Sequence, residues 1–113
     1  MKIIELELKG LLRIELQTHA DSRGHFVERW NKDRFRACDL PEFVQDNFSR
    51  SSGRVLRGLH FQHDRPQGKL VSCVRGKVLD VVVDLRKKSS TFGQHCAVEL
   101  SGDTASWLWV PPG

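Results

Sequence analysis

Tyrosine is absent from the 113-residue chain. These residues therefore offer no phenol as the acid in a proton-transfer reaction. Cysteine is scarce as well, since Cys38, Cys73 and Cys96 are an odd number at wide spacings and form no C-x-x-C pair. This pattern supports neither a zinc ribbon nor a redox motif, and it favours reduced, structural thiols.

Long apolar runs are also missing. No stretch approaches the ~20 residues that span a bilayer as a helix, and Glu5 and Glu7 come too early for a signal peptide. We therefore expect a cytoplasmic protein with no membrane partner. Hydrophobic residues make up 39% and charged residues 28% of the chain, which fits one soluble globular domain over residues 1–113.

The net charge of +4 does not by itself predict a nucleic-acid partner. Basic residues are scattered among acids, and the densest cluster, residues 86–88, is typical of a turn between strands. No recognition helix or aromatic RNA-binding motif accompanies this cluster. We interpret the charge as a solvated surface with a mild preference for anionic ligands.

Alternating apolar and polar residues predict a chain made mostly of strands. A helix of one or two turns is expected over residues 31–37, with Asn31 as its N-cap and Pro41 beyond its end. Short strands separated by turns indicate an all-β sandwich or barrel. The expected strands cover residues 4–8, 12–16, 25–30, 43–49, 55–61, 69–74, 77–85, 95–100 and 106–110.

His60 and Lys69 are the most informative chemical groups. An imidazole with a pKa near ~6.5 can take a proton from carbon at neutral pH, and a nearby cation can stabilise an enolate. Taken alone, His60 is more simply interpreted as a hydrogen-bonded core or rim histidine. Lys69 is equally consistent with an exposed lysine at the start of a strand, or with an inward one that needs Asp80 or Asp84 as its partner.

Several polar residues on the expected strands are candidates for the inner wall of a barrel. Arg57 lies three positions before His60, so a regular strand turns the two side chains to opposite faces. Gly58 between them makes a bulge plausible. The candidates for the inner wall are Gln45, Asn47, Arg57 and Lys69.

No metal site is predicted. His60 and His63 form an H-x-x-H pair, and Gln62 occupies the position where a metal site on a strand more often has its second histidine. The run from Arg23 to Phe26 is a turn leading into a strand, and it also has the composition of an arm for phosphate and a flat ring.

Together, these stretches closely resemble the dTDP-4-dehydrorhamnose 3,5-epimerases of the RmlC-like cupin superfamily. The resemblance implies a cupin-type double-stranded β-helix, or jelly roll, and a homodimer that exchanges N-terminal strands. The matching stretches follow the family's order and spacing: 21–28 (DSRGHFVE), 43–49 (FVQDNFS), 55–62 (VLRGLHFQ), 67–71 (QGKLV), 75–86 (RGKVLDVVVDLR), 90–93 (STFG) and 107–113 (WLWVPPG).

The resemblance also implies a cofactor-independent enzyme. It would convert dTDP-4-dehydro-6-deoxyglucose into dTDP-4-dehydrorhamnose by inverting C3 and C5. His60 matches the family's general base, and Lys69 matches the lysine that stabilises the enolate. The implied substrate-binding residues are Arg23, Phe26, Glu28, Gln45, Asn47 and Arg57.

The family pattern continues beyond residue 113 into a segment with a second histidine, an acidic tyrosine and the aspartate that pairs with the base. We therefore expect a jelly roll that is incomplete at its C-terminus, as a fragment or as a natural short form. One alternative is a non-catalytic cupin that binds a nucleotide sugar and lacks the acid. A related keto-sugar isomerase is less favoured because the chain has no H-x-H pair.

Overall fold

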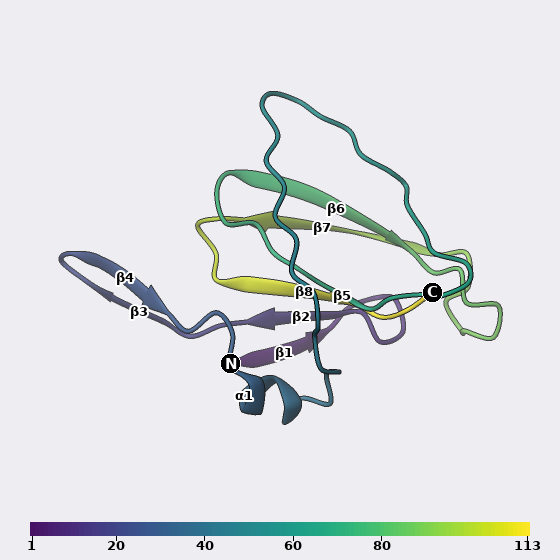
Figure 1. Ribbon diagram of the computed structural model, residues 1–113, viewed down its shortest axis with the longest axis horizontal. Helices are drawn as coiled ribbons and strands as arrows, with labels where there is room; N and C mark the ends of the chain where they lie inside the picture. Colours follow the sequence, from purple (N-terminus) through teal and green to yellow (C-terminus); the bar gives the residue numbers. More distant parts are fainter. The chain divides into compact units, whose positions relative to one another are not determined.

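The computed structural model describes residues 1–113, and the chain forms two compact units. The strand unit comprises residues 1–28 and 61–113, and the helix unit comprises residues 29–60. The expected all-β class is confirmed, because eight strands accompany one five-residue helix (Figure 1). The elements are β1 (Lys2–Glu5), β2 (Leu12–Glu15), β3 (Thr18–Asp21), β4 (Gly24–Val27), α1 (Lys32–Arg36), β5 (Lys69–Val71), β6 (Lys77–Val83), β7 (His95–Ser101) and β8 (Ser106–Val110).

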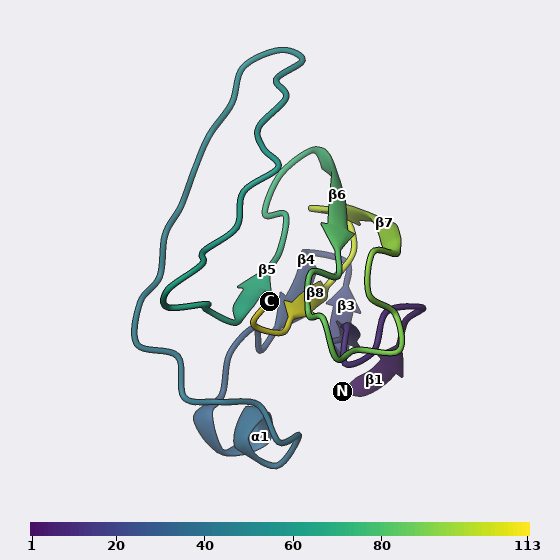
Figure 2. The same ribbon diagram turned by 90° about the vertical axis from the view of Figure 1, so that its right-hand side faces the viewer.

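Three antiparallel sheets make up the strand unit. The first has the order β1-β2-β8-β5, the second pairs β6 with β7, and the third is the β3–β4 hairpin. The turned view shows β6 and β7 as a pair separate from β5 and β8 (Figure 2). The first two sheets pack on one another without joining by hydrogen bonds into a closed barrel.

The core lies between these two sheets, and strand alternation explains which residues fill it. On β7, Cys96, Val98 and Leu100 are buried and the residues between them are exposed. Leu108 of β8 lies opposite Val71 of β5 and is fully buried. Full burial of a leucine contributes about 2–3 kcal/mol. The face of each sheet that carries these residues is called the inner face below.

The opposite, outer face of the four-stranded sheet carries the two tryptophans of β8. Trp107 lies opposite Ile14, and Trp109 lies opposite Leu12, so both indoles share one face, as the i, i+2 spacing predicts. Ile14 is fully buried and Trp109 is 8% exposed. A Cβ atom at Gly68 would lie 2.2 Å from the Trp109 ring, so only a glycine fits in front of β5.

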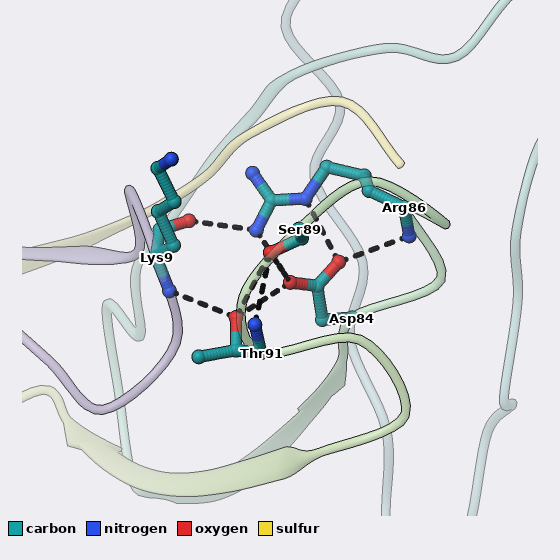
Figure 3. Close-up of polar contacts among 5 residues, drawn as sticks. All are labelled: Lys9, Asp84, Arg86, Ser89 and Thr91. Carbon is teal, nitrogen blue, oxygen red and sulfur yellow. Dashed lines mark hydrogen bonds and ion pairs between the residues drawn. The ribbon is translucent and has the colours of Figure 1, made fainter.

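A buried carboxylate closes one end of the strand unit (Figure 3). Asp84 follows β6, and its carboxylate accepts hydrogen bonds from the Arg86 Nε and Nη2 atoms, both at 2.8 Å. The hydroxyls of Ser89 and Thr91 donate to it as well, each at 2.6 Å. The Arg86 guanidinium, the largest cause, and these hydroxyls hold the pKa of Asp84 far below its usual range.

The same network reaches the connection between β1 and β2. Arg86 Nη2 donates to the Lys9 carbonyl at 2.7 Å, and the Lys9 backbone N–H donates to Thr91 Oγ1 at 3.2 Å. The chain segments around Lys9, Asp84 and Thr91 are therefore held together by one charged centre (Figure 3).

In the helix unit, α1 confirms the short helix expected near residues 31–37. Asn31 is the N-cap, and its side chain accepts a hydrogen bond from the Arg34 backbone N–H at 3.2 Å. Phe35 is 2% exposed and packs against Trp30 with a ring-centroid distance of 4.6 Å. A cap and a buried aromatic residue thus fix a helix too short to be stable alone.

The strands expected over residues 43–49 and 55–61 are wrong for this structure, which has no strand between α1 and β5. Alternation predicts a strand only where a neighbouring strand accepts its hydrogen bonds and one face is covered. Val44 is 93% exposed and Leu56 is 94% exposed, so the apolar face of each run is uncovered. The alternation of apolar and polar residues does not show whether a neighbouring strand is present.

Candidate functional site

Lys69 opens β5 on the inner face of the four-stranded sheet. It lies opposite Val110, which packs against the core, and two positions before Val71, which does the same. The Lys69 side chain itself is exposed. Lys69 is therefore an exposed lysine at the start of a strand, which is the first of the two expectations, although its backbone position is on the inner face.

Asp80 occupies the inner face of the other sheet. It lies opposite Val98 in the β6–β7 pair and is partly buried. Burial raises the pKa of Asp80, and the positive charge of Lys69 acts in the opposite direction. The charge of Lys69 therefore acts on Asp80, one of its two candidate partners.

Asp84, the other candidate partner, is committed elsewhere. Its carboxylate is 2.8 Å from Arg86 Nη2, and the Asp84 side chain is 1% exposed. The expectation that Asp84 pairs with Lys69 is corrected on this ground: the adjacent guanidinium and two hydroxyls already fill its acceptor positions.

His60 and Arg57 lie in the helix unit, outside any strand, and both are exposed. His60 is therefore not a buried core histidine. Gly58 has a φ of +112°, in the region that favours glycine, so the backbone between the two residues does not follow strand alternation. Arg57 Nη2 donates to Ser51 Oγ at 3.1 Å.

Gln45 and Asn47 form a second polar group in the helix unit. The Gln45 Nε2 atom donates to Asn47 Oδ1 at 3.2 Å, and both side chains are exposed. The expectation that Gln45, Asn47 and Arg57 line the inner wall of a barrel differs from the structure, where all three are exposed and outside strands. Among the four expected wall residues, Lys69 alone lies on a strand.

The β3–β4 hairpin carries the remaining expected residues. Arg23 Nη2 is 2.6 Å from Asp21 Oδ2, and the Arg23 backbone N–H donates to Asp21 Oδ1 at 2.9 Å. The Arg23 side chain, the largest cause, lowers the pKa of Asp21. Phe26 is 68% exposed, and Glu28 lies just beyond β4. The hairpin thus presents a guanidinium and an open aromatic ring.

The expected site residues are divided between the two units. His60 belongs to the helix unit and Lys69 to the strand unit. The structure contains no group of three or more His, Cys, Asp or Glu residues that could hold a metal ion, and none of its helices is both long and apolar enough to cross a membrane. The strand unit carries Arg23, Phe26, Glu28 and Lys69; the helix unit carries Gln45, Asn47, Arg57 and His60.

Two polar contacts were not predicted from the sequence. One is the Asp84 network, for which the Ser and Thr residues after Arg86 are the available signal. The other is a 2.8 Å hydrogen bond from the Cys96 thiol to Glu7 Oε2. Burial, followed by this carboxylate, raises the pKa of Cys96 to about 11. Cys73 and Cys96 are buried and free, as the cysteine spacing predicts.

Two antiparallel sheets around one core, with a cation and a carboxyl group on their inner faces, define an open jelly roll of the cupin type. The family model of dTDP-4-dehydrorhamnose 3,5-epimerase matches residues 5–113. The chain belongs to this family.

Similar proteins carry the same description. The dTDP-4-dehydrorhamnose 3,5-epimerase of Methanothermobacter thermautotrophicus is 45% identical over 113 residues, which cover 99% of this chain and 61% of that protein. The Shigella flexneri protein of the same name is 46% identical, over 100% of this chain and 64% of its own length. The chain thus spans less than two thirds of these relatives.

A solved structure gives the same family. The crystal structure of dTDP-6-deoxy-D-glucose-3,5-epimerase from Legionella pneumophila, in complex with dTDP-4-keto-L-rhamnose, superimposes with a TM-score of 0.92 at 46% identity. The match covers 99% of this chain and 61% of that one. The expected fold is therefore confirmed. The 46% identity of this solved structure also supports the family assignment.

Proposed function

We propose that the protein is an epimerase of a dTDP-linked 4-keto-6-deoxyhexose. The reaction is the conversion of dTDP-4-dehydro-6-deoxyglucose into dTDP-4-dehydrorhamnose, with inversion at C3 and C5. Family membership over residues 5–113 supports this proposal. The structural observation that supports it most is the position of Lys69. This cation belongs to the inner face of one sheet, and Asp80 belongs to the inner face of the other.

In this mechanism the C4 ketone acidifies the protons on C3 and C5. The neutral imidazole of His60 takes one proton from carbon, and the electron pair moves into an enolate. The ammonium of Lys69 stabilises the negative charge that develops on the enolate oxygen. A proton returned to the opposite face of the carbon inverts the centre; we assign this acid to no residue of the chain, which contains no tyrosine.

The substrate-binding roles come from the family resemblance, and the chemistry of the exposed groups supports those of Arg23 and Phe26. Arg23 keeps N–H donors beyond those that bond to Asp21, and these can bind a phosphate oxygen. Phe26 offers a flat surface to the base. The residues proposed to complete substrate binding are Glu28, Gln45, Asn47 and Arg57.

The assembly and the compartment are also proposals. We propose one cupin domain over residues 1–113 and a homodimer that exchanges N-terminal strands. The exposed strands of the β3–β4 hairpin support the exchange, because an uncovered hairpin is available to a second copy. The free thiols of Cys73 and Cys96 fit a reducing compartment, the cytoplasm. Light scattering of the protein, compared with that of a Phe26→Ala variant, tests the dimer.

Deuterium exchange tests the activity. The natural polypeptide that carries this sequence is expected to introduce solvent deuterium at C3 and C5 of the keto-sugar. A His60→Ala variant is expected to lose this exchange by about 10²–10⁴-fold, the usual contribution of a general base. His63→Ala is the matched control, since His63 is exposed and paired with Asp64. Equal loss in both variants, or loss in neither, would show that the base is not His60.

A non-catalytic cupin that binds a nucleotide sugar is the second candidate. The exposed guanidinium and ring of the hairpin favour it. Calorimetry with dTDP separates the two functions. Binding of dTDP without exchange at either carbon supports the second candidate, and exchange at C3 or C5 removes it.

A further inference from the structure

We propose that Asp80 is a positioning residue for Lys69: its carboxylate, on the inner face of β6, holds the lysine ammonium in place for the enolate oxygen. This inference rests on the proposed function. It assigns a role to a partly buried acid that the mechanism above does not use.

Strand register places the two groups on facing surfaces. Asp80 lies opposite Val98 on β7, and Val98 belongs to the core between the sheets. Lys69 lies opposite Val110 on β8, which packs against the same core from the other sheet. The acid and the amine therefore belong to the two facing inner surfaces, and the charge of Lys69 acts on the Asp80 carboxyl.

The surroundings of Asp80 make this arrangement effective. Val78 and Val82 lie two positions to either side of Asp80 on the same strand and share its face. An apolar wall lowers the local dielectric constant, so a charge in front of it acts more strongly than in water. Among the charged groups, Lys69 is the one that opposes the effect of burial on the Asp80 carboxyl.

Other ionisable groups on the inner faces have their own partners. Arg13 Nη2 donates to the Glu99 carbonyl at 2.7 Å, and Cys96 donates to Glu7. Glu15 lies 4.0 Å from the Lys2 ammonium. Asp80 and Lys69 are thus left to one another, which is the basis for assigning them a joint role.

A lysine needs such a partner because its four-carbon stem is flexible. A fixed carboxylate restricts the rotamers of the stem. In the reaction, the ammonium must already point at the place where charge develops, since preorganised charge is what lowers the barrier. Asp80 supplies this orientation without contact to the substrate.

An Asp80→Asn variant of the natural polypeptide tests the inference. We expect kcat for deuterium exchange to fall about tenfold, the equivalent of one pKa unit of interaction, with KM nearly unchanged. Asp80→Glu should restore kcat, because it keeps a carboxylate that can hold the ammonium. A merely structural role for Asp80 would not lower kcat while leaving KM unchanged.

Glu99→Gln is the matched control. Glu99 pairs with Lys77 at 3.2 Å and belongs to the outer face of the same β6–β7 sheet. The Glu99→Gln variant also removes one carboxylate from this sheet, and it is expected to exchange deuterium at the wild-type rate. If Asp80→Asn matches this control in kcat, Asp80 does not position Lys69.

A carboxyl titration distinguishes this failure from failure of the proposed function. Carbon-13 NMR of Asp80 should show a higher pKa in Lys69→Met than in the wild type, whether or not the protein exchanges deuterium. No exchange by the wild type would overturn the proposed function, and with it the role in catalysis. An Asp80 pKa that is equal in the two proteins would overturn the pairing itself.

Discussion

Asp80 lies in β6 and Asp84 directly follows it, four positions later, yet the two carboxyls occupy opposite electrostatic environments. Asp84 is 3% exposed and is surrounded by donors from Arg86, Ser89 and Thr91. Its pKa is held far below the usual range, whereas burial raises the pKa of Asp80. The Asp84 carboxylate has hydrogen-bond donors at its acceptor positions. The Asp80 carboxyl lies among apolar side chains, and Lys69 is the one cation that acts on its pKa.

The difference separates the part of the strand unit that stabilises the fold from the part in which we propose the chemistry. A buried carboxylate with all its acceptor positions filled holds chain segments together. A partly buried carboxyl whose pKa is raised disfavours the folded state at neutral pH, and such groups cluster at functional sites. We therefore expect substitutions at Asp84 to affect stability and substitutions around Lys69 to affect turnover.

The largest effect on stability is expected for Asp84→Ala. Its loss leaves the guanidinium of Arg86 and two hydroxyls without their acceptor, which costs about 3 kcal/mol of unfolding free energy. Urea denaturation of the natural polypeptide measures this loss. Asp64→Ala is the control, because the Asp64 side chain is 93% exposed, and its effect should stay within about 0.5 kcal/mol. A loss below about 1 kcal/mol for Asp84→Ala contradicts the structural role of the network.

Lys69→Met should have the opposite profile. Exchange of deuterium into the keto-sugar should fall by about 10²–10³, the usual cost of one lost group that stabilises an enolate. The urea midpoint should hardly change, because Lys69 is exposed. Lys77→Met is the control on β6, where the lysine pairs with Glu99 at an exposed surface. Equal exchange rates in the two variants would break the assignment of Lys69.

Gly68→Ala tests the packing directly before Lys69. The new Cβ atom would overlap the Trp109 ring, 2.2 Å away, and overpacking of this kind costs about 1–3 kcal/mol. Urea unfolding of Gly68→Ala, Trp109→Leu and the double variant measures the coupling. We expect the double variant to lose less than the sum of the two single variants. Additive losses would mean that the ring does not set the requirement for glycine.

The smallest effect is a contrast in the pH dependence of stability. The pKa of Asp84 is lower in the folded state than the ~3.9 of an unfolded aspartate, so its stabilisation is present above about pH 4 and is lost as the pH falls. In the Asp84→Asn variant, stability should therefore fall less as the pH is lowered. The pKa of Asp80 is raised, so its contribution is present at low pH and is lost as the pH rises. Asp80→Asn should therefore unfold at an equal or higher urea concentration at pH 7.

If the Asp80→Asn and Asp84→Asn variants showed the same dependence of stability on pH, the contrast between Asp80 and Asp84 would be wrong. Urea midpoints measured from pH 2 to 7 at constant ionic strength provide this test. Constant ionic strength matters because exposed charges elsewhere on the chain are screened by salt.

Local pattern was enough to predict much of the strand unit. Alternation predicted β1, β2, β7 and β8, and the shared face of Trp107 and Trp109. The helix followed from its cap, Asn31. The runs at residues 43–49 and 55–61 failed because a strand needs a neighbour, and no local pattern contains that information.

Residue types also limited the candidates for a partner of Lys69. A lysine that points inward would require an acid, which selected Asp80 and Asp84 as candidates. The choice between them depended on Arg86, which lies two positions after Asp84 and satisfies it. Such a contact is set by the loop after β6, so the sequence alone left both partners open.

Solvent deuterium incorporation at C3 and C5 of dTDP-4-dehydro-6-deoxyglucose, followed by proton NMR, tests the account most directly. The natural polypeptide is predicted to exchange both positions, with the rate dependent on His60 and Lys69. Binding of dTDP without exchange at either carbon would contradict the proposed epimerase and would leave a nucleotide-sugar-binding cupin in its place.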